Sequence, residues 1–481
     1  MTLGELLEKT DIVDVAADLG IEVLGVCFDS RKQLSGEVFI AVRGLESDGH
    51  DYIKEAVTNG AACVICEEAP SIETPYVLVR DTRKALATVS SAWFGDPSAK
   101  LCVIGVTGTN GKTTVTSLIK HVIEEVSGEK VGLIGTTGNM IGDKAFEALL
   151  TTPDSYELHE LFARMLSEGC RYVVMEVSSH ALSLERVHGI EFEIGVFTNL
   201  SPDHLDFHSS MDDYALAKAL LFKNSRHSVV NIDDEYAQIM VDNAKAAVYT
   251  YSAKDDAADI VAKDIKLHAD KVGFCVLVVS SLVRVELGIP GMFSVYNALA
   301  AISSVRILGY EISCIADALS QSVGVKGRAE VVPTGLGFTV IIDYAHTPDA
   351  LANIISAARL FTQGRVVTLF GCGGDRDKKK RPLKGAIASE NSDFVIVTSD
   401  NPRTEKPGDI INDILAGMKG TKTPSRVIEN RREAIFWALE NASHGDVLIL
   451  AGKGHESYQI FGNEKVHFDE REVVAEFLMK E

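Results

Sequence analysis

The chain has 481 residues, of which 46% are hydrophobic and 24% are charged, a balance typical of a folded protein with two to four domains. Its formal net charge of −21 argues against non-specific nucleic-acid binding, which requires a broad basic surface. No apolar run approaches the roughly 18 residues needed to span a bilayer, and the acidic start argues against a secretory signal, so we expect a cytoplasmic protein without membrane contacts.

In the first hundred residues, apolar runs at 37–44, 61–66 and 76–80 predict strands. A Gly-Asp-Pro turn within 93–100 predicts a linker. The second of these strands contains Cys63 and Cys66, the one C-x-x-C pattern among eight cysteines. A redox or metal site is the alternative, but no second pair or nearby histidine completes one, so we expect reduced thiols that pack in the core.

A second block extends to about residue 325. Strands are predicted near 131–135, 171–177, 192–199 and 228–232, and a helix over 212–223. Residues 255–290 form short β-rich runs, which we interpret as a hairpin insertion.

The third block begins near residue 326. It contains four apolar, β-branched runs at 338–345, 365–374, 393–400 and 446–454, as in a parallel sheet buried on both faces. We therefore predict an α/β protein with three domains, at 1–98, 99–325 and 326–481.

The segment "TGTNGKTT" (107–114) lies between a predicted strand and a predicted helix. The general phosphate-loop pattern would require glycine where Val106 stands. Gly108 and Gly111 nevertheless allow a sharp turn close to phosphate oxygens, and the helix adds its N-terminal dipole. Lys112 is expected to reach the β- and γ-phosphates, and the Thr113 hydroxyl to bind Mg²⁺.

Polar clusters follow the strands of the second block, where open parallel sheets bind ligands. Glu176 ends one strand and is suited to the Mg²⁺ of a nucleotide. Ser178, Ser179 and His180 follow without a nucleophile-elbow pattern, and His180 fits either a structural role or a ligand contact.

A second cluster offers four metal or phosphate ligands within six positions: Asp203, His204, Asp206 and His208. A solvated capping loop would explain Asp203 but not the histidines. Nearby, Lys218 stands in the apolar helix "ALAKALLF". Its side chain could reach the surface by snorkelling, or carbon dioxide could convert the amine to a carbamate that binds metal.

Two clusters belong to the third block. Asp343, Tyr344 and His346 end a strand, where an aspartate commonly accepts ribose hydroxyls. Six basic residues crowd into 376–384 after a glycine-rich turn, which favours a positive pocket for an anion over a solvated basic face.

Taken together, "TGTNGKTT", "MEVSSHAL", "TNLSPDHLDFH", "DYAHTPDAL", "GCGGDRDKKKRP", "DNPRTE" and "AGKGHE" resemble the Mur ligases over almost the whole chain. Members of that family use "GTNGKT" in place of the general phosphate loop, which accounts for Val106. The resemblance implies a small N-terminal α/β domain, a central mostly parallel sheet flanked by helices, and a Rossmann-like C-terminal domain.

Within the family, the chain is similar to the members that add the third residue of the peptidoglycan stem peptide. The resemblance implies an ATP-dependent ligase acting in cell-wall synthesis, and hence in cell shape, division and the cell cycle. Its substrates would be ATP, UDP-N-acetylmuramoyl-L-Ala-D-Glu and an amino acid, and we expect a monomer. The segment 28–53 fits the UDP-binding domain of these enzymes.

The resemblance also implies the site residues. The ATP site would comprise Gly108, Thr109, Asn110, Gly111, Lys112, Thr113, Thr114, Asn297, Arg328, Asp343 and His346. The UDP-muramoyl-peptide would contact Ser30, Thr151, Thr152, Ser178 and Arg186. The catalytic residues would be Lys112, Glu176, His204 and Lys218, with two Mg²⁺ held by Thr113, Glu176, His204 and Lys218, the last as N6-carboxylysine.

The amino acid added is expected to be meso-diaminopimelate, because members adding it carry Asp-Asn-Pro-Arg. The ligands implied for it are Arg376, Asp400, Asn401, Arg403, Gly452 and Glu456. Arg403 could clamp the distal carboxylate, and Glu456 suits the distal ammonium. The alternatives are the lysine-adding ligase, another ATP-dependent amide ligase such as folylpolyglutamate synthetase, and a nucleotide-switched binding module.

Overall fold

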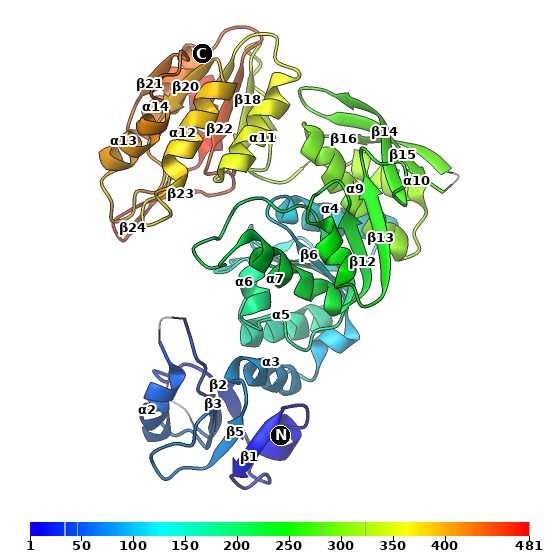
Figure 1. Cartoon of the computed structure of the whole chain (residues 1–481), viewed down its shortest axis with the longest axis vertical. Helices are drawn as coiled ribbons and strands as arrows, with labels where there is room; N and C mark the ends of the chain where they lie inside the picture. The colour runs from blue at the N-terminus through cyan, green and yellow to red at the C-terminus, as the bar shows by residue number, and fades with distance from the viewer. Residues whose placement is uncertain (33–34, 46, 280, 323, 481) are drawn as a thin grey trace.

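The computed structural model describes residues 1–480 apart from 33–34, 46, 280 and 323. Three of these positions fall in the segment 28–53, which was predicted to belong to a UDP-binding domain, and one falls in the β-rich segment 255–290. At those positions the two predictions lie outside the described residues. Figure 1 shows three sheet-based parts arranged along the long axis, in chain order from the N-terminus to the C-terminus. The predicted α/β class is confirmed.

The first part is a five-stranded sheet in the order β1-β5-β4-β3-β2, in which β1 alone runs antiparallel to its neighbour. Its strands are β1 (Ile12–Ala16), β2 (Gly25–Cys27), β3 (Glu37–Ile40), β4 (Cys63–Cys66) and β5 (Tyr76–Val79), and its helices are α1 (Leu3–Leu6), α2 (Ile53–Thr58) and α3 (Thr82–Trp93). All eight cysteines of the chain are free thiols. Burial in β4 raises the pKa of Cys63 to about 12 and that of Cys66 to about 11, which suits packing residues rather than reactive thiolates.

The second part is an eleven-stranded sheet in the order β16-β15-β14-β13-β12-β11-β6-β10-β7-β8-β9, parallel from β14 to β7. Its strands are β6 (Cys102–Thr107), β7 (Val131–Ile134), β8 (Asn139–Ile141), β9 (Lys144–Phe146), β10 (Tyr172–Glu176), β11 (Phe192–Phe197), β12 (Ser225–Asn231), β13 (Ala247–Ser252), β14 (Ile260–Leu267), β15 (Val272–Val278) and β16 (Ser281–Leu287). Its helices are α4 (Lys112–Ser127), α5 (Ser155–Ser167), α6 (Ser179–Ser183), α7 (Met211–Lys223), α8 (Ala237–Asp242), α9 (Met292–Ile307) and α10 (Ile312–Ser320).

Both faces of this sheet are covered because side chains alternate along each strand. On β6, Val103 packs into one buried cluster with residues of α5 and α7, whereas Ile104 and Val106 pack into another with α4 and α9. Val106 is thus a core residue, which explains why this loop has no glycine there. The sheet leaves only the carboxyl ends of its parallel strands for a ligand.

The short β-strands and hairpin predicted at 255–290 are confirmed for the described residues. Strand β14 pairs with β13 in parallel, and β15 and β16 follow antiparallel, so these residues extend the central sheet. Val272, Phe274 and Val276 of β15 are fully buried in the same cluster as α9. This shared core, rather than a local turn, fixes the segment.

The third part is a six-stranded sheet in the order β17-β18-β22-β19-β20-β21, parallel except for β17, with a small hairpin beside it. Its strands are β17 (Glu330–Val332), β18 (Thr339–Asp343), β19 (Val366–Phe370), β20 (Phe394–Val397), β21 (Ser425–Val427) and β22 (Val447–Ala451), and the hairpin is β23 (Tyr458–Phe461) with β24 (Glu464–His467). Its helices are α11 (Pro348–Arg359), α12 (Lys380–Asn391), α13 (Pro407–Gly417), α14 (Arg431–Glu440) and α15 (Glu470–Leu478).

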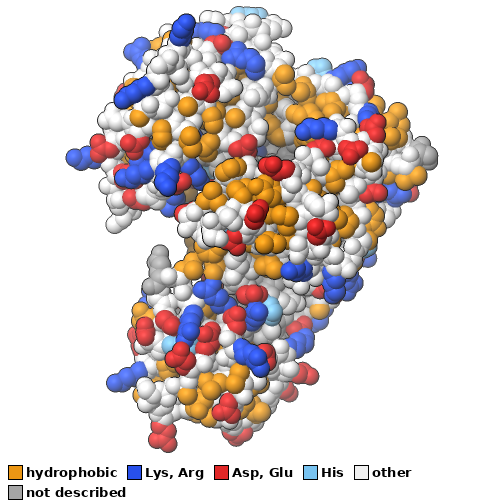
Figure 2. All heavy atoms as spheres, viewed as in Figure 1, with side chains coloured by type: hydrophobic (Ala, Val, Ile, Leu, Met, Phe, Trp, Pro, Cys, Tyr) orange, Lys and Arg blue, Asp and Glu red, His pale blue; other side chains and the backbone are white. Residues whose placement is uncertain are grey.

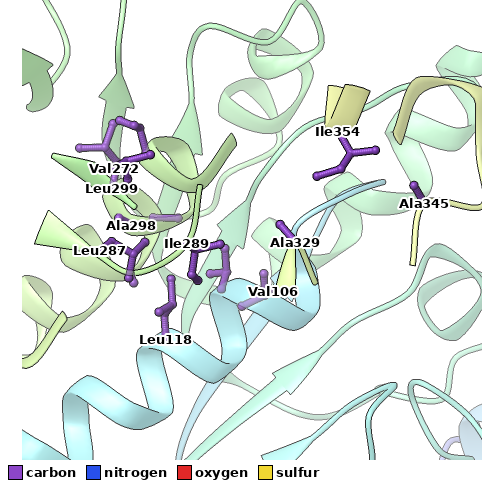
Figure 3. Packing of buried hydrophobic residues seen from close by; sticks show 14 of the residues in the cluster. Val106, Leu118, Val272, Leu287, Ile289, Ala298, Leu299, Ala329, Ala345 and Ile354 are labelled. Atoms are coloured by element: carbon purple, nitrogen blue, oxygen red, sulfur yellow. The ribbon is translucent and has the colours of Figure 1, made fainter. Parts of the chain in front are cut away.

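A hydrophobic junction joins the second and third parts. Figure 3 shows Ala329 beside Val106, between Ile289 of the core packed on α4 and the residues Ala345 and Ile354 of the third part. This apolar continuity holds the ends of the two parallel sheets close together. Among the described residues, no helix is long and apolar enough to cross a membrane.

A fully buried ion pair fixes the third part. Arg431, the first residue of α14, donates to Glu470 Oε1 at 2.8 and 2.9 Å and to the carbonyl oxygen of Ala451 at 2.9 Å. It therefore ties the first turns of α14 and α15 to the end of β22.

Replacing Arg431 with methionine should lower the free energy of unfolding of this part by about 3–5 kcal/mol, because the Glu470 carboxylate loses its buried partner. Denaturant unfolding measures the change. The matched control is Arg432→Met, which breaks an exposed pair with Glu476 and should cost no more than about 1 kcal/mol. Equal effects of the two substitutions would contradict this assignment.

Candidate active site

The loop after β6 can be built only with glycine at two positions. Gly108 has φ 146° and Gly111 has φ 89°. A Cβ atom on Gly108 would lie 1.9 Å from Thr198 Oγ1, and one on Gly111 would lie 2.6 Å from Asn297 Oδ1. Asn297 lies on α9, so its close approach places that helix against the loop, together with β6, α4 and the segment after β11.

The next strand end holds the loop in place. The backbone oxygen of Asn199 accepts from Thr109 N at 2.8 Å, and Asn199 Oδ1 accepts from Asn110 N at 3.0 Å. Thr198 Oγ1 donates to the carbonyl of Asn110 at 2.7 Å. Helix α4 starts from Gly111 without a side-chain cap, so the N–H groups of its first turn can serve an anion.

Two lysine side chains converge on one backbone oxygen of this loop. Lys112 Nζ and Lys218 Nζ each donate to Gly108 O at 2.9 Å. Desolvation lowers the pKa of Lys112, and burial together with the neighbouring Lys112 lowers the pKa of Lys218 well below its usual range. Lys218 is 1% exposed and lies over the ring of Tyr214, so it does not snorkel to the surface.

A carboxylate lies at the adjacent strand end. Glu176 closes β10 and is the register partner of Val106 on β6, which places it beside the loop. Thr136, after β7, donates to its carboxylate through the backbone N–H at 2.8 Å and the hydroxyl at 3.1 Å. Glu176 is buried, and these two bonds fix its orientation.

The cluster at 203–208 divides into two groups. Asp203 accepts from Lys380 at 2.6 Å, and although burial opposes ionisation, His204 and Lys380 lower its pKa to about 2. Desolvation lowers the pKa of His204 to about 4 despite Asp203, so its imidazole is neutral at pH 7 and able to bind a metal. By contrast, the buried His208 ring bonds to the hydroxyl of Ser179 at 2.9 Å, which makes it part of the scaffold.

The loop between the second and third parts approaches α4. Arg328 Nη2 donates to Thr113 Oγ1 at 3.0 Å and packs over the ring of Tyr344. Asp343 accepts backbone N–H groups from Ala329 and Ala345, each at 2.7 Å. Its carboxylate therefore fixes this connection, and a ribose hydroxyl would have to share the same oxygens.

A further contact joins the third part to the phosphate loop, since Asn110 Nδ2 donates to Asp349 at 2.9 Å. Within the second part, Thr109 Oγ1 lies 3.2 Å from the hydroxyl of Tyr214 on α7. His346 is exposed and bonds through Nδ1 to the backbone oxygen of Tyr344 at 3.0 Å.

A cavity of about 660 Å³ lies between the first and second parts. It is lined on one side by Ser30, Arg43 and Tyr52, and on the other by Asp154, Ser155, Leu184 and Arg186. Ser30 Oγ donates to Glu55 at 3.0 Å.

Polar residues continue from this cavity toward Glu176. Arg186 Nη1 donates to the carbonyl of Thr152 at 3.0 Å, and Thr152 Oγ1 donates to the backbone oxygen of Glu176 at 2.9 Å. Ser178 N donates to Thr152 Oγ1 at 3.1 Å, and Thr151 pairs with Thr136 at 3.0 Å. The four residues predicted to bind one substrate in this part of the chain therefore lie in one connected group.

The prediction of a positive pocket at 376–384 is wrong. Arg381 is buried and paired with Glu405 and Asp413, and Lys384 is buried against the carbonyl of Gly371. A cavity of about 470 Å³ does lie here, but its lining is mixed in charge: Asp206, Asp375, Arg376, Asp377, Lys378 and Glu405. The acids that pair with the basic run, Glu405, Asp413 and Asp203, come from segments distant in sequence. Figure 2 shows basic and acidic side chains intermixed on the face of the molecule in view.

The turn after β20 carries Asn401 and Arg403, which has φ 52°. Arg403 Nη1 donates to the carbonyl of Gly374 at 2.6 Å, and a Cβ on Gly373 would lie 3.0 Å from the same Nη1 and 3.7 Å from Arg376 Cγ. Both arginines therefore border the glycine-rich turn after β19.

The turn after β20 also meets the loop after β22. Asn401 Nδ2 donates to Glu456 Oε2 at 2.9 Å, and a Cβ on Gly452 would lie 3.2 Å from Asp400 Oδ2. Lys453 bonds to Asn401 and Glu456 and was not predicted as a site residue, although it lies within the segment "AGKGHE". Asn199, Thr136 and Lys380 were missed as well, because each acts through a contact that is distant in sequence.

Family models cover most of the chain: the Mur ligase middle domain matches residues 106–305, the Mur ligase glutamate ligase domain matches 327–454, and the Mur ligase family catalytic domain matches 22–98. The chain belongs to the Mur ligase family. The family prediction is thereby confirmed.

Relatives in the family are similar over nearly their whole length. The UDP-N-acetylmuramoyl-L-alanyl-D-glutamate–2,6-diaminopimelate ligase of Caldanaerobacter subterraneus subsp. tengcongensis is 50% identical over 97% of this chain and 96% of the relative. The ligase of the same name from Clostridioides difficile is 45% identical over the full length of both chains. A solved structure of a ligase with that name superposes with a TM-score of 0.74 at 31% identity, over 100% of this chain and 99% of that one.

Replacing Gly108 with alanine should abolish nucleotide binding, because the methyl group would overlap the Thr198 hydroxyl and force the loop to move. Binding of ATP measured by calorimetry tests this. The control is Gly128→Ala at the end of α4, where a Cβ meets nothing within 4 Å and only the left-handed φ of 70° costs stability, by about 1–2 kcal/mol. ATP binding retained by Gly108→Ala would show that the loop is not the nucleotide site.

Proposed function

We propose that this chain is the ATP-dependent ligase that joins meso-2,6-diaminopimelate to the D-glutamate γ-carboxylate of UDP-N-acetylmuramoyl-L-alanyl-D-glutamate. The reaction builds a peptidoglycan precursor, on which cell shape, division and the cell cycle depend. The names of the relatives that are 50% and 45% identical support this function. The observation that carries the choice of amino acid is the turn after β20. At one end its Arg403 lies beside Arg376, and at the other its Asn401 binds the Glu456 carboxylate.

This arrangement matches the distal centre of diaminopimelate, which carries both a carboxylate and an ammonium. Arg403 and Arg376 are the residues for the carboxylate, because guanidinium groups bind carboxylates in a bidentate manner. Glu456, held by Asn401, is the residue for the ammonium. Asp400 and Gly452 complete the site, since the glycine leaves room beside the Asp400 carboxylate.

The UDP-muramoyl-peptide would lie along the cavity between the first and second parts. We assign Ser30 to its uridine end, because Ser30 lines that cavity. We assign Thr151, Thr152, Ser178 and Arg186 to its peptide end, because they form one connected group that continues to Glu176. The γ-carboxylate of the substrate would thus approach the phosphate loop.

ATP would bind to the loop 108–114, with Asn297, Arg328, Asp343 and His346 on its base and ribose side. The γ-carboxylate attacks the γ-phosphate, ADP leaves, and an acyl phosphate forms. The amine of diaminopimelate then attacks the activated carbonyl, and the tetrahedral intermediate releases phosphate to leave an amide. Lys112 and the N-terminus of α4 stabilise the negative charge that develops on the phosphoryl group.

Two Mg²⁺ ions suit this donor set. Thr113 and Glu176 offer the hard oxygen ligands that Mg²⁺ prefers, and His204 offers a neutral imidazole. The described residues hold no group of three or more His, Cys, Asp or Glu side chains arranged for a metal ion, so phosphate oxygens and water would complete the coordination, as is usual for Mg²⁺. When bound, the ions neutralise the repulsion between carboxylate and triphosphate.

Lys218 would supply the remaining ligand as N6-carboxylysine. Only a neutral amine has the lone pair that adds to carbon dioxide, and the addition releases one proton and leaves an anionic carbamate. The lowered pKa of Lys218 supports a neutral amine, and its bond to Gly108 O places the amine at the phosphate loop.

The chain would work as three domains, 1–98, 99–325 and 326–481, each built on one of the sheets. The residues assigned to the three substrates all come from one chain, which is consistent with a monomer. We place the reaction in the cytoplasm, where ATP is available, with small molecules as its partners and no role for nucleic acid or membrane.

Release of ADP on mixing the protein with ATP, UDP-muramoyl-dipeptide and diaminopimelate tests the function. Substituting lysine for diaminopimelate should reduce kcat/KM by about 30-fold or more, because the paired arginines lose their carboxylate partner. Arg403→Ala should cause a loss of the same size with diaminopimelate and leave the KM for ATP within about twofold. Equal use of lysine would favour the lysine-adding ligase, and no amino-acid-dependent ADP release would reject the proposal.

Replacing Lys218 with alanine should reduce kcat by about 100-fold or more, because a charged group at the reacting phosphate is lost. Short carboxylic acids such as acetate should partly restore activity by mimicking the carbamate, and steady-state kinetics measures the rescue. The control is Lys223→Ala, an exposed lysine at the end of the same helix, which should keep full activity. Full activity of Lys218→Ala would remove the carbamate from the mechanism.

A further inference from the structure

Lys453 is the first residue after the glycine that follows β22, and its side chain is forced inward. Gly452 has φ 112° and Gly454 has φ 52°. A Cβ on Gly454 would lie 2.6 Å from Tyr344 Cβ and 2.7 Å from the carbonyl of Gly327, and one on Gly452 would lie 3.2 Å from Asp400 Oδ2, so neighbours approach the loop on both sides of Lys453. The Lys453 side chain is 0% exposed.

The buried ammonium is surrounded by groups of the proposed amino-acid site. Lys453 Nζ donates to Glu456 Oε2 at 2.9 Å and to Asn401 Oδ1 at 3.1 Å, and it lies 3.5 Å from Asp400 Oδ1. Burying a cation is costly unless it is paired and hydrogen-bonded. Each of its three partners belongs to the set implied for diaminopimelate, so the cost is offset within that site.

These contacts fix the orientations of the Asn401 and Glu456 side chains. Asn401 Oδ1 also accepts from Ile460 N at 3.1 Å, so the amide nitrogen must point to Glu456 Oε2. Glu456 Oε2 therefore receives two donors, from Lys453 and Asn401. Among the described residues no hydrogen bond reaches Glu456 Oε1, which leaves this oxygen for a donor from a ligand.

We propose that Lys453 is a positioning residue that sets the preference for a substrate amino acid with an ammonium at its far end. It acts by holding Glu456 Oε2, so that Oε1 is presented in one orientation. This role rests on the proposed function, because Lys453 would set which amino acid the proposed diaminopimelate site prefers. The competing explanation is that Lys453 only balances buried charge and stabilises the fold.

The test compares meso-diaminopimelate with 2-aminopimelate, which lacks the distal ammonium but keeps both carboxylates. The readout is the ratio of kcat/KM for the two substrates at saturating ATP and UDP-muramoyl-dipeptide. In Lys453→Met this ratio should fall by about 10-fold, the loss expected when a group that orients a ligand is removed, while the KM for ATP stays within about twofold.

The control for stability is Thr368→Val, which removes a buried hydrogen bond to Ser392 in the same sheet but touches no residue of the site. It should lower the melting temperature without changing the substrate ratio. If Lys453→Met does not fold, Lys453→Gln, which keeps a polar end group, takes its place with the same expected fall.

Glu456→Gln tests whether Lys453 acts through Glu456. Alone it should lower the same ratio, and adding Lys453→Met should cause no further fall. Independent, multiplying effects of the two substitutions, or an unchanged ratio in Lys453→Met, would overturn the positioning role while leaving the proposed function intact. A wild-type protein that releases no ADP with diaminopimelate would overturn the proposed function, and this inference with it.

Discussion

Two lysine amines share one backbone oxygen, that of Gly108, and much of the site follows from this contact. Lys112 and Lys218 each bond to it at 2.9 Å, so when both are protonated they repel each other in a region that is largely removed from water. The repulsion is relieved if one amine is neutral, or if an anion comes between them. The proposed reaction brings anions to this point, and the proposed carbamate would change the sign of one partner.

The parallel sheets explain why the relevant groups meet. Strands β6, β10 and β11 are neighbours and end together, so the phosphate loop, Glu176 and the segment 198–208 lie at one edge. The apolar junction around Ile289 and Ala329 brings the third part to the same edge (Figure 3). Contacts from Arg328, Asp349 and Lys380 then reach the central residues directly. Binding energy from three substrates can therefore be used at one place.

The sequence alone allowed strands and site residues to be predicted where a short stretch of residues shows a recognisable pattern. Apolar, β-branched runs predicted the strands, and polar residues at their ends predicted Glu176 and His204 as candidates, whereas Asn401 followed from the family resemblance. The strands at 255–290 were predicted, but their place at the edge of the central sheet was not, because alternation shows that a strand exists but not which strand it pairs with. The six basic residues at 376–384 were misread because their partners Glu405, Asp413 and Asp203 lie elsewhere in the chain. Lys453 lies in the segment "AGKGHE", but that segment does not reveal its role, which depends on two loops meeting.

The most direct measurement of the central claim is the chemical state of Lys218 itself. Carbon-13 NMR of the protein in ¹³C-labelled bicarbonate reports a carbamate without any need for turnover. The account predicts one protein-bound carbamate signal, which is absent from Lys218→Ala and retained in Lys223→Ala. A wild-type protein that shows no such signal with ATP and Mg²⁺ present would contradict it.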